Sequence, residues 1–409
     1  MSQPDYPDYN DFVHTGPDTA AGRYLRRFWQ PVHRSEDLAQ GQAVPIRIMS
    51  EDFTLFRGAS GKPYVVAFRC AHRGAQLSTG WVEGDCIRCM YHGWKYEGSG
   101  QCVEQPGEED GFAAKTKIRS YPTEEYLGLI FVYFGEGNPP PLRKHPDFER
   151  PGVLETGLPE YWPCNYFNRL DNACDVGHVS FTHRESALRA GRPEQLALRT
   201  VSSFETEYGI RTSVSVPGRA PFHTHFHMPN TNQTRSRARI EGSLKDAATL
   251  WVDRLFWRVP VDDENSVSFV IDWMPLAGEE AKAYRQRRQQ ARSQVRVSPN
   301  EYGQSVIAGK MRLEDLDPQM STYYLFWIED YAVQVGQGRI ADRPNEHLGR
   351  MDVGVILLRK IWQRELSNVA AGKPLKEWVT AAGLNDFPRP LPGGEGRGEG
   401  FATAKHGDS

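Results

Sequence analysis

Three things are scarce in this sequence of 409 residues: cysteine, an excess of charge of either sign, and long apolar runs. Six cysteines are too few for a disulfide framework in a chain of this length. A net charge of -3 provides no field that would draw the chain to nucleic acid or to an anionic membrane. The opening MSQPDYPDYNDF lacks the basic and apolar regions of a signal peptide, and no run reaches the roughly 20 apolar residues of a membrane span. We therefore expect a cytoplasmic protein that binds neither nucleic acid nor membrane.

Short runs rich in β-branched and aromatic residues, separated by turn residues, occupy residues 45 to 135. These runs are PIRIM, FTLFRG, YVVAFRC and LIFVYFG. They predict a small antiparallel β domain within residues 1–145. The Gly- and Pro-rich segment GEGNPPPLRKHP (135–146) disfavours a continuing strand or helix, so we expect the domain to end there.

Residues 146–392 mix strand and helix patterns. The strand-like runs TLWVDRLFWRVPV and SVSFVIDWMPL flank a turn-like VDDEN, and the segment 352–372 has apolar residues at helical spacing, with Asp352 as a candidate N-cap and Gly372 as a candidate stop. These patterns predict an α+β domain in which a long helix packs on an antiparallel sheet. From residue 393 the sequence GGEGRGEG has no strand before it and no helical pattern after it, so 393–409 is predicted to be a flexible tail and not a phosphate loop.

Two tight pairs of cysteine and histidine stand in the β domain. Cys70-Ala-His72 and Cys89-Met-Tyr-His92 are separated by sixteen residues. Four such ligands suit either a structural zinc or a [2Fe-2S] cluster with cysteine on one iron and histidine on the other. A common zinc pattern groups its cysteines in one half, whereas each half here has one of each, which favours the cluster. Cys86, three residues before Cys89, adds a Cys-x-x-Cys pair as an alternative redox or zinc site.

The whole stretch CAHRGAQLSTGWVEGDCIRCMYHGWKY resembles the Rieske cluster-binding motif of ring-hydroxylating oxygenases. The resemblance implies a [2Fe-2S] cluster clamped by two loops, with the ligands Cys70, His72, Cys89 and His92. Imidazole ligands raise the reduction potential from about -400 mV to between about -150 and +300 mV, so such a cluster accepts electrons from a reductase and passes them on. Cys86 and Cys102 are then ordinary thiols, and Cys86 departs from the usual family pattern.

A second set of metal-binding side chains lies in NRLDNACDVGHVSFTH (168–183). His178 and His183 are five residues apart, so they can share a metal only if the helix carrying the first one ends and the chain turns. Asp175 lies three residues before His178 and is expected on the same helical face. Two histidines and one carboxylate form the facial triad of non-haem Fe(II) oxygenases, which leaves positions open for O₂. By itself, a histidine pair of this kind is more often structural.

The segment resembles the Asp-x-x-His-x-x-x-x-His iron motif of the same family. The resemblance implies that Asp175 is a bridge and not a ligand: it would hydrogen-bond His178 and also His92 of a neighbouring subunit, giving an electron path across an interface. A ring of subunits, as a homotrimer or stacked trimers, is therefore implied. The role of Asp171 stays open.

The third ligand is then a carboxylate from far along the chain. In FWIEDYAVQVGQGRIADR the pattern around Asp330 resembles the ligand helix of the family, whereas Glu329 would point roughly 100° away on a helix. Asp342 is the alternative. The stretch from Asp330 to Arg359 resembles the phthalate 4,5-dioxygenase branch, which has only the large subunit. We therefore expect a helix-grip catalytic domain.

No Gly-rich dinucleotide fingerprint follows a predicted strand, so NAD(P)H would be oxidised by a separate reductase, with or without a ferredoxin. The resemblance implies an oxygenase component that uses O₂ to hydroxylate or O-demethylate a small aromatic substrate, an aromatic acid or a lignin-derived compound. Dihydroxylation, monohydroxylation and demethylation share this metal chemistry. The alternative class is an electron carrier or zinc-stabilised binding protein, which would need only the β domain.

Three histidines alternate along PFHTHFHMPN: His223, His225 and His227 share one face of a predicted strand. That face is a candidate wall of the substrate pocket, where imidazoles would hold a carboxylate or a phenol. The alternatives are a solvated or structurally hydrogen-bonded strand face, and a zinc site. Asn230 and Arg235 are weaker candidates. The basic run 283–297 is predicted to be a helix with a solvated face, or alternatively a dock for an acidic reductase.

Overall fold

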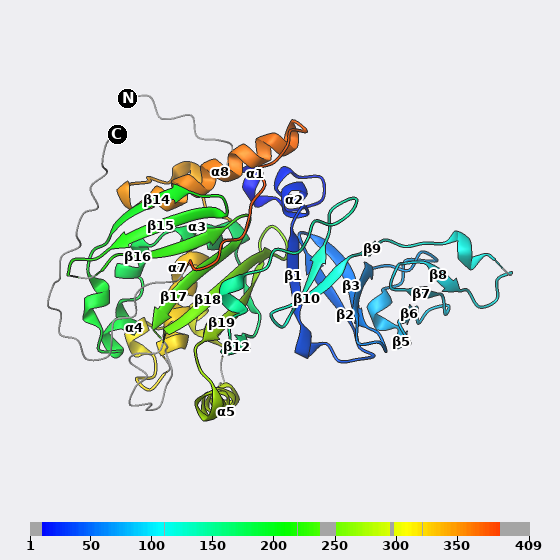
Figure 1. Ribbon diagram of the computed structural model, residues 1–409, viewed down its shortest axis with the longest axis horizontal. Coiled ribbons are helices and arrows are strands. Elements are labelled where there is room, and N and C mark those ends of the chain that lie inside the picture. The colour runs from blue at the N-terminus through cyan, green and yellow to red at the C-terminus, as the bar shows by residue number, and fades with distance from the viewer. Residues whose placement is uncertain are drawn as a thin grey trace, which may run out of the picture.

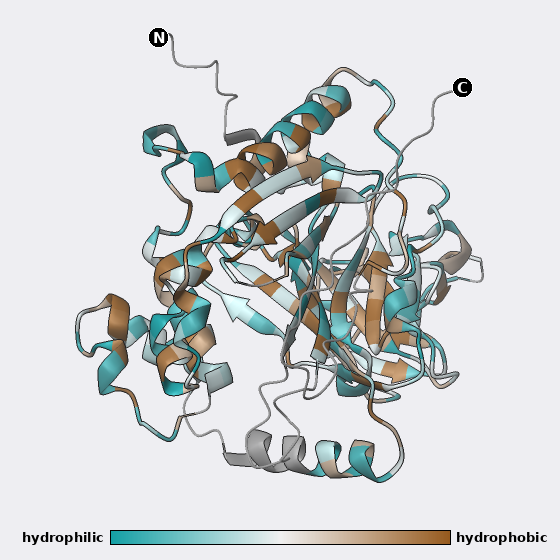
Figure 2. Ribbon diagram, turned by 60° about the vertical axis from the view of Figure 1, so that its left-hand side comes forward, coloured by the Kyte–Doolittle hydropathy of each residue, from teal (hydrophilic) through white to brown (hydrophobic). Residues whose placement is uncertain are grey.

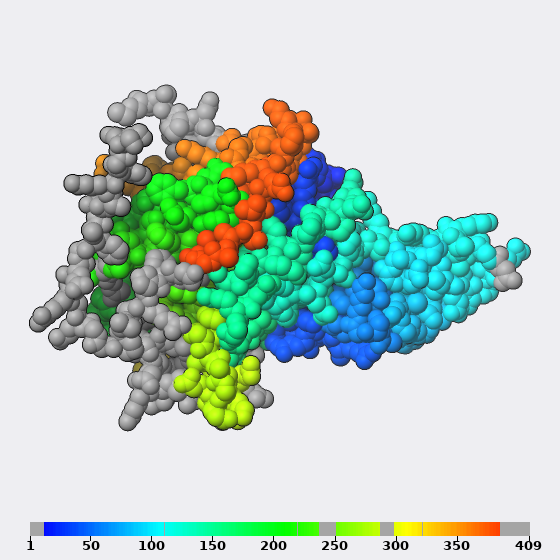
Figure 3. All heavy atoms as spheres, viewed as in Figure 1, coloured from blue at the N-terminus to red at the C-terminus, as the bar shows by residue number. Residues whose placement is uncertain are grey.

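The computed structural model describes residues 10–109, 111–218, 220–237, 251–294, 298–320 and 322–384. The predicted tail 393–409 lies outside these residues. The described chain has two parts, a larger one around a broad sheet and a smaller lobe of short strands that projects to one side (Figures 1 and 3).

The smaller lobe consists of three antiparallel sheets, as the apolar runs predicted. One sheet has the order β1 (Trp29–Arg34), β11 (Leu129–Tyr133), β10 (Thr123–Tyr126). The second has the order β2 (Ala43–Ile48), β3 (Glu51–Arg57), β4 (Pro63–Ala67), β9 (Ser120–Tyr121). The third has the order β5 (Trp81–Glu83), β6 (Cys86–Arg88), β7 (Lys95–Glu97), β8 (Cys102–Glu104) and forms the outer end of the lobe (Figure 1).

The larger part is built on an eight-stranded antiparallel sheet with the order β12-β19-β18-β17-β16-β15-β14, in which β13 also pairs with β19. Its strands are β12 (Val153–Thr156), β13 (Glu160–Trp162), β14 (Thr200–Glu205), β15 (Gly209–Ser215), β16 (Phe222–His227), β17 (Thr231–Arg237), β18 (Trp251–Pro260) and β19 (Ser266–Met274). The hairpin of β18 and β19 confirms the pairing predicted from the two flanking apolar runs.

Eight α-helices surround this sheet within the described residues. They are α1 (Asn10–Val13), α2 (Ala20–Leu25), α3 (Tyr166–Cys174), α4 (Arg184–Arg189), α5 (Gly278–Gln294), α6 (Pro299–Ile307), α7 (Thr322–Gly336) and α8 (Val353–Ala370). The long helix predicted for 352–372 is confirmed as α8, with Asp352 at its N-cap position and Gly372 just beyond its end at φ +63°. Helix α5, which covers most of the basic run, lies at the edge of the larger part (Figures 1 and 2), and its residues Ala281 and Tyr284 pack against apolar residues of β12, β18 and β19. None of the described helices combines the length and the apolar character that a membrane crossing requires.

The two faces of the broad sheet have different neighbours. On one face, α8 packs so closely against α3 and β14 that only glycine fits at position 354. A Cβ at Gly354 would lie 2.3 Å from the carbonyl oxygen of Cys174 and 3.2 Å from the hydroxyl of Ser203. On the other face, Trp257 packs against Phe131 of the smaller lobe, with ring centroids 5.6 Å apart. We call these the helix face and the lobe face. One apolar core, which includes Phe131 of the lobe and Trp257 of the sheet, joins the two parts.

The helices that precede Trp29 contact the larger part of the chain. Helix α2 contacts α8, and the backbone N–H of Thr15 donates to Asp263 in the β18–β19 turn (2.9 Å). Strands of the smaller lobe begin only at Trp29. By their contacts, the helices before that strand therefore belong with the sheet of the larger part.

Candidate functional site

The two Cys–His pairs lie on two loops with matching backbones, one between β4 and β5 and the other between β6 and β7. The carbonyl of Cys70 accepts from the N–H of Gly74, and that of Cys89 accepts from the N–H of Gly93, each over 3.0 Å. The two glycines have φ values of +72° and +75°, which glycine adopts without a steric cost. Each loop therefore turns back in the same way four residues after its cysteine.

In both loops the sulfur atom of the cysteine is buried and the ring of the histidine is exposed. Cys70 and Cys89 are buried, whereas His72 and His92 are exposed at the tip, with ring centroids 4.4 Å apart. Trp94 stacks on His72 at 4.6 Å. Burial raises the pKa of the Cys70 thiol, so ligation to a metal would have to displace its proton.

This arrangement fits a two-iron cluster better than a single zinc ion. Among the described residues, three ligand atoms lie within 4.8 Å of one another only in a group from the larger part of the chain, and the loop side chains form no such group. Ligands of one tetrahedral zinc would all converge on a point about 2.0–2.3 Å from each of them. Two thiols inside and two imidazoles outside instead match the cysteine and histidine ends of a [2Fe-2S] cluster.

The second set of side chains lies where α3 ends. Helix α3 stops at Cys174, and Asp175 is its C-cap with an extended backbone. His178 stands in the 3₁₀ turn Gly177–Ser180, and His183 directly precedes α4. The expectation that Asp175 and His178 share a helical face is therefore wrong, because the helix ends before His178. The chain does turn between the two histidines, as a shared metal site requires.

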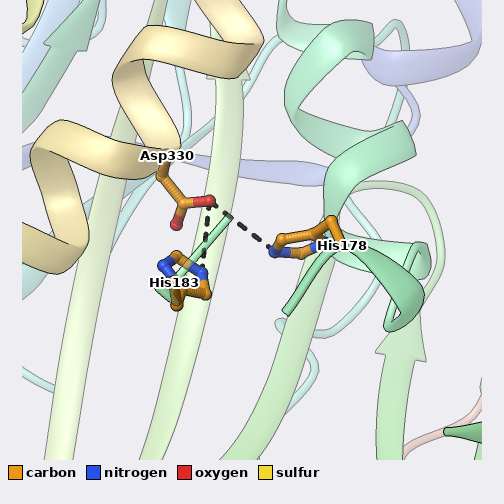
Figure 4. A group of neighbouring side chains, drawn as sticks. All are labelled: His178, His183 and Asp330. Carbon is orange, nitrogen blue, oxygen red and sulfur yellow. Dashed lines mark ion pairs between the residues drawn. The ribbon is translucent and has the colours of Figure 1, made fainter. Parts of the chain in front are cut away.

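Three ligand atoms converge at this place, from the turn, from the start of α4 and from α7 (Figure 4). The Nε2 atoms of His178 and His183 lie 3.7 and 3.6 Å from Oδ1 of Asp330. These separations are too long for hydrogen bonds. Oδ1 of Asp330 is buried and accepts no hydrogen bond from the described residues. A metal ion at about 2.0–2.2 Å from each atom would satisfy all three donors.

A buried carboxylate that sequence reasoning left aside orients one of these imidazoles. Nδ1 of His183 lies 3.1 Å from Oε2 of Glu329, whose Oε1 accepts from the N–H of Ser186 (2.9 Å). Glu329 is 1% exposed. Because consecutive helical residues point about 100° apart, Asp330 faces the metal position while Glu329 reaches the far side of His183. The adjacent acidic residues Glu329 and Asp330 were the feature of the sequence from which this role of Glu329 could have been inferred.

Asp175 contacts His178 differently from the expected carboxylate hydrogen bond. Its backbone carbonyl accepts from Nδ1 of His178, while its Oδ2 lies 3.8 Å from that nitrogen. Oδ1 of Asp175 accepts from the N–H groups of Gly177 (2.8 Å) and His178 (3.2 Å). The side chain of Asp175 is 28% exposed, so it can be reached from outside the chain.

The histidines of β16 lie on the lobe face, whereas the three converging ligands lie on the helix face. His225 pairs with Gln233 and, through β17, with Leu255, which points the same way as Trp257. His225 bonds the hydroxyl of Tyr208 (2.7 Å) and the carbonyl of Leu384 (3.0 Å).

The other two histidines of the strand are also engaged. His227 bonds Gln233 (3.0 Å), and His223 bonds Ser213 (2.9 Å). This placement argues against a pocket wall of His223, His225 and His227 and favours the structurally hydrogen-bonded alternative.

The remaining candidates are also engaged elsewhere. Asp171 binds the guanidinium groups of Arg343 (3.0 Å) and Arg359 (2.8 Å). Arg235 pairs with the buried Asp253. Asp342 begins a 3₁₀ turn outside the converging group, and Asn230 is buried and donates to Gln30 (2.9 Å) and to the carbonyl of Arg258 (2.9 Å).

Asn172, which sequence reasoning did not single out, lies 3.5 Å from Nε2 of His178.

Comparison with known proteins agrees with this geometry. Residues 28–122 match the Rieske [2Fe-2S] domain. The chain is 27% identical over 401 residues to the 5,5'-dehydrodivanillate O-demethylase oxygenase subunit of Sphingobium sp. (strain NBRC 103272 / SYK-6), covering 92% of this chain and 84% of that one. It is 26% identical to the phthalate 4,5-dioxygenase oxygenase subunit of Pseudomonas putida, covering 87% and 84%.

The fold is shared with solved structures. A mutant of NdmA from Pseudomonas putida CBB5 with theobromine superposes with a TM-score of 0.63 at 19% identity, over 85% of this chain and 92% of that one. Dicamba monooxygenase superposes with a TM-score of 0.59 at 17% identity, over 85% and 99%. The chain therefore has a Rieske [2Fe-2S] domain at residues 28–122 and is similar over most of its length to oxygenase subunits that act on aromatic compounds.

Proposed function

We propose that the chain takes electrons from a separate NAD(P)H-dependent reductase and uses O₂ to hydroxylate or O-demethylate an aromatic substrate. The observation that carries this proposal is the convergence of His178, His183 and Asp330 in a chain that also has a Rieske domain. An electron carrier would have no use for this group on the helix face. A zinc-stabilised binding protein is disfavoured by the loop side chains, which do not converge on one ion.

In this proposal, Cys70, His72, Cys89 and His92 hold the cluster, and His178, His183 and Asp330 hold one Fe(II). Such an iron supplies open coordination positions at which O₂ can react. The chain's own contribution is to fix its ligands: Glu329 bonds Nδ1 of His183 and the carbonyl of Asp175 bonds Nδ1 of His178, so both imidazoles direct Nε2 toward Asp330. Phe326 stacks on His183 and limits its rotation.

The arrangement of one chain supports electron transfer between subunits. The cluster loops lie at the outer end of the smaller lobe, and that lobe packs on the face of the sheet opposite to His178 and His183 (Figure 1). The sheet therefore separates the two sites within a chain. The exposed imidazole of His92 and the partly exposed Asp175 are both accessible to another copy. We therefore propose a homotrimer in which His92 of one subunit contacts Asp175 of the next.

Two relatives guide the choice of substrates. One is named for O-demethylation of 5,5'-dehydrodivanillate and another for dioxygenation of phthalate. We propose aromatic acids and methoxylated lignin-derived aromatics as the first substrates to test.

The experiment combines the reconstituted protein with a phthalate-dioxygenase-type reductase, NADH and a panel of such compounds, and it measures O₂ uptake and product formation. Substrate-dependent O₂ uptake that disappears in Asp330→Ala supports the proposal. Equal uptake by Asp330→Ala and the unchanged protein would contradict it.

A further inference from the structure

Three charged side chains are buried together on the helix face of the sheet. They are Glu160 of β13, Arg169 of α3 and Arg258 of β18, which are 6%, 3% and 7% exposed. Nη2 of Arg169 and Nη1 of Arg258 lie 3.7 and 3.8 Å from the same oxygen of Glu160. Both separations exceed hydrogen-bond length. Two guanidinium groups thus share one carboxylate and leave an excess of one positive charge.

Both guanidinium groups keep buried N–H donors that no described residue accepts. These are Nε and Nη1 of Arg169 and Nε of Arg258. Their other contacts are to the hydroxyl of Ser268, at 3.3 Å from Arg169 and 2.7 Å from Arg258. The Arg169 guanidinium also lies over the ring of Trp162. Buried polar groups in proteins almost always have partners, so several unpaired N–H groups in one place need an explanation.

An arginine four residues earlier on the same strand behaves differently. Arg254 points to the same face of β18 as Arg258 and pairs with Asp272 through two hydrogen bonds, one of 2.6 Å from Nη2. That pair has the fork-to-carboxylate geometry that arginine prefers. Arg169 and Arg258 have no such partner among the described residues. Their contacts are therefore not those of an ordinary structural ion pair.

Electrostatics link this cluster to the candidate iron site. Burial, together with the neighbouring Arg169, lowers the pKa of Arg258 to about 9. Burial raises the pKa of Glu160, and the charge of Asp330 acts on all three groups. A divalent ion bound to Asp330 would make this region more positive still. An anion between the two arginines would neutralise that excess and occupy their free N–H groups.

We infer that Arg169 and Arg258 bind a carboxylate of the substrate. The inference rests on the proposed function and narrows it from aromatic compounds in general to aromatic carboxylic acids. A carboxylate bound between the two guanidinium groups would lie where the charge of Asp330 also acts. Glu160 holds the two arginines near each other and at the same time competes with the anion.

Calorimetric titration of the metal-loaded protein with benzoate, and with neutral benzamide as the matched probe, tests this site. We expect Arg169→Lys and Arg258→Lys each to weaken benzoate binding at least about tenfold, because lysine cannot form the two-pronged contact. Glu160→Gln should tighten it by about tenfold, since the competing charge is removed. Benzamide binding should change in none of these variants, and Arg254→Lys should leave benzoate binding unchanged.

Three results would overturn the inference: wild-type protein that binds benzamide as tightly as benzoate, benzoate affinity that neither arginine variant alters, or weaker benzoate binding by Glu160→Gln. Iron content measured on the same preparations separates this inference from the proposed function. If iron is bound at His178, His183 and Asp330 but benzoate affinity depends on neither arginine, the inference is wrong and the proposed function stands. If benzoate binding depends on the arginines but the chain holds no mononuclear iron, the proposed oxygenase function is wrong and the anion site stands.

Discussion

At the scale of single residues, the candidate iron site depends on groups close to the ligands in sequence: Glu329 is one position from Asp330, and Asp175 is three positions from His178. Asp330 faces the two imidazoles, while Glu329 is turned to the far side of His183. The sequence pattern around Asp330 was sufficient to propose the ligand. It was not sufficient to assign a role to Glu329, because its partner lies 146 residues away. The carbonyl contact of Asp175 could not be predicted either, since it depends on where α3 ends.

Glu329→Gln should lower the affinity for mononuclear iron by about 10- to 100-fold and leave the cluster intact, because the lost carboxylate no longer fixes Nδ1 of His183. Iron content after dialysis against a graded chelator, beside acid-labile sulfide as the measure of the cluster, checks this. Glu280→Gln on the exposed start of α5 is the control and should match the unchanged protein. Iron retention by Glu329→Gln equal to that of the control would refute the positioning role.

Asp175→Asn should abolish turnover while both metal centres remain. Asparagine keeps one side-chain oxygen, so the hydrogen bonds from the N–H groups of Gly177 and His178 can persist and the turn can hold its shape. What is lost is the negative charge at the proposed junction between subunits. Turnover with the reductase, together with iron and sulfide content, provides the check. Normal turnover would remove Asp175 from the electron path.

At the scale of elements, apolar periodicity predicted the strands and the long helix. It did not predict which side of the sheet the histidines of β16 face. Alternation along the strand correctly predicted that its three histidines share a face. Which face of β16 adjoins the helices depends on its pairing with distant strands and on the contact of His225 with the carbonyl of Leu384. Local sequence contains neither fact, so it could not show that these histidines face the lobe.

Buried imidazoles on the lobe face should make the fold sensitive to acid. Burial lowers the pKa of His225 to about 4 and that of His227 to about 3. The unfolded chain, with histidine pKa values near 6.5, therefore binds more protons than the folded one as the pH falls below about 6.5. The free energy of unfolding should drop by up to about 1.4 kcal/mol per pH unit for each group, down to its folded pKa.

Denaturant titrations at pH 7, 6 and 5 measure this slope. His227→Gln, whose amide can still reach Gln233, should reduce the slope by about one proton, because one buried imidazole fewer then titrates. His347→Gln, at an exposed histidine, is the control and should leave the slope unchanged. An identical slope in all three proteins would show that these imidazoles do not set the acid sensitivity.

At the scale of the whole molecule, a single chain separates its two proposed metal sites by a sheet. Motif spacing indicated both sites, and the relation of the two parts of the chain could be inferred only from the family resemblance. The core that joins them is formed by residues such as Phe131 and Trp257, which lie far apart in sequence. No local pattern links such residues.

Mixed oligomers test electron transfer between subunits. Cys89→Ser lacks the cluster and Asp330→Ala lacks the mononuclear iron, so each alone should be inactive. Co-expressed in equal amounts, they should recover about a quarter of the normal activity, because about three in four random trimers are mixed and each contains one productive pair out of three. A mixture of separately purified, non-exchanging oligomers is the control. No recovery in verified mixed oligomers would favour transfer within one chain.

The most direct test of the central claim is an anaerobic assay of iron and acid-labile sulfide with an EPR spectrum of the dithionite-reduced protein. We expect about three irons and two sulfides per chain, with a Rieske-type signal, and a loss of one iron in Asp330→Ala with the signal unchanged. Zinc without acid-labile sulfide would contradict the cluster, and two irons in both proteins would contradict the mononuclear site at His178, His183 and Asp330.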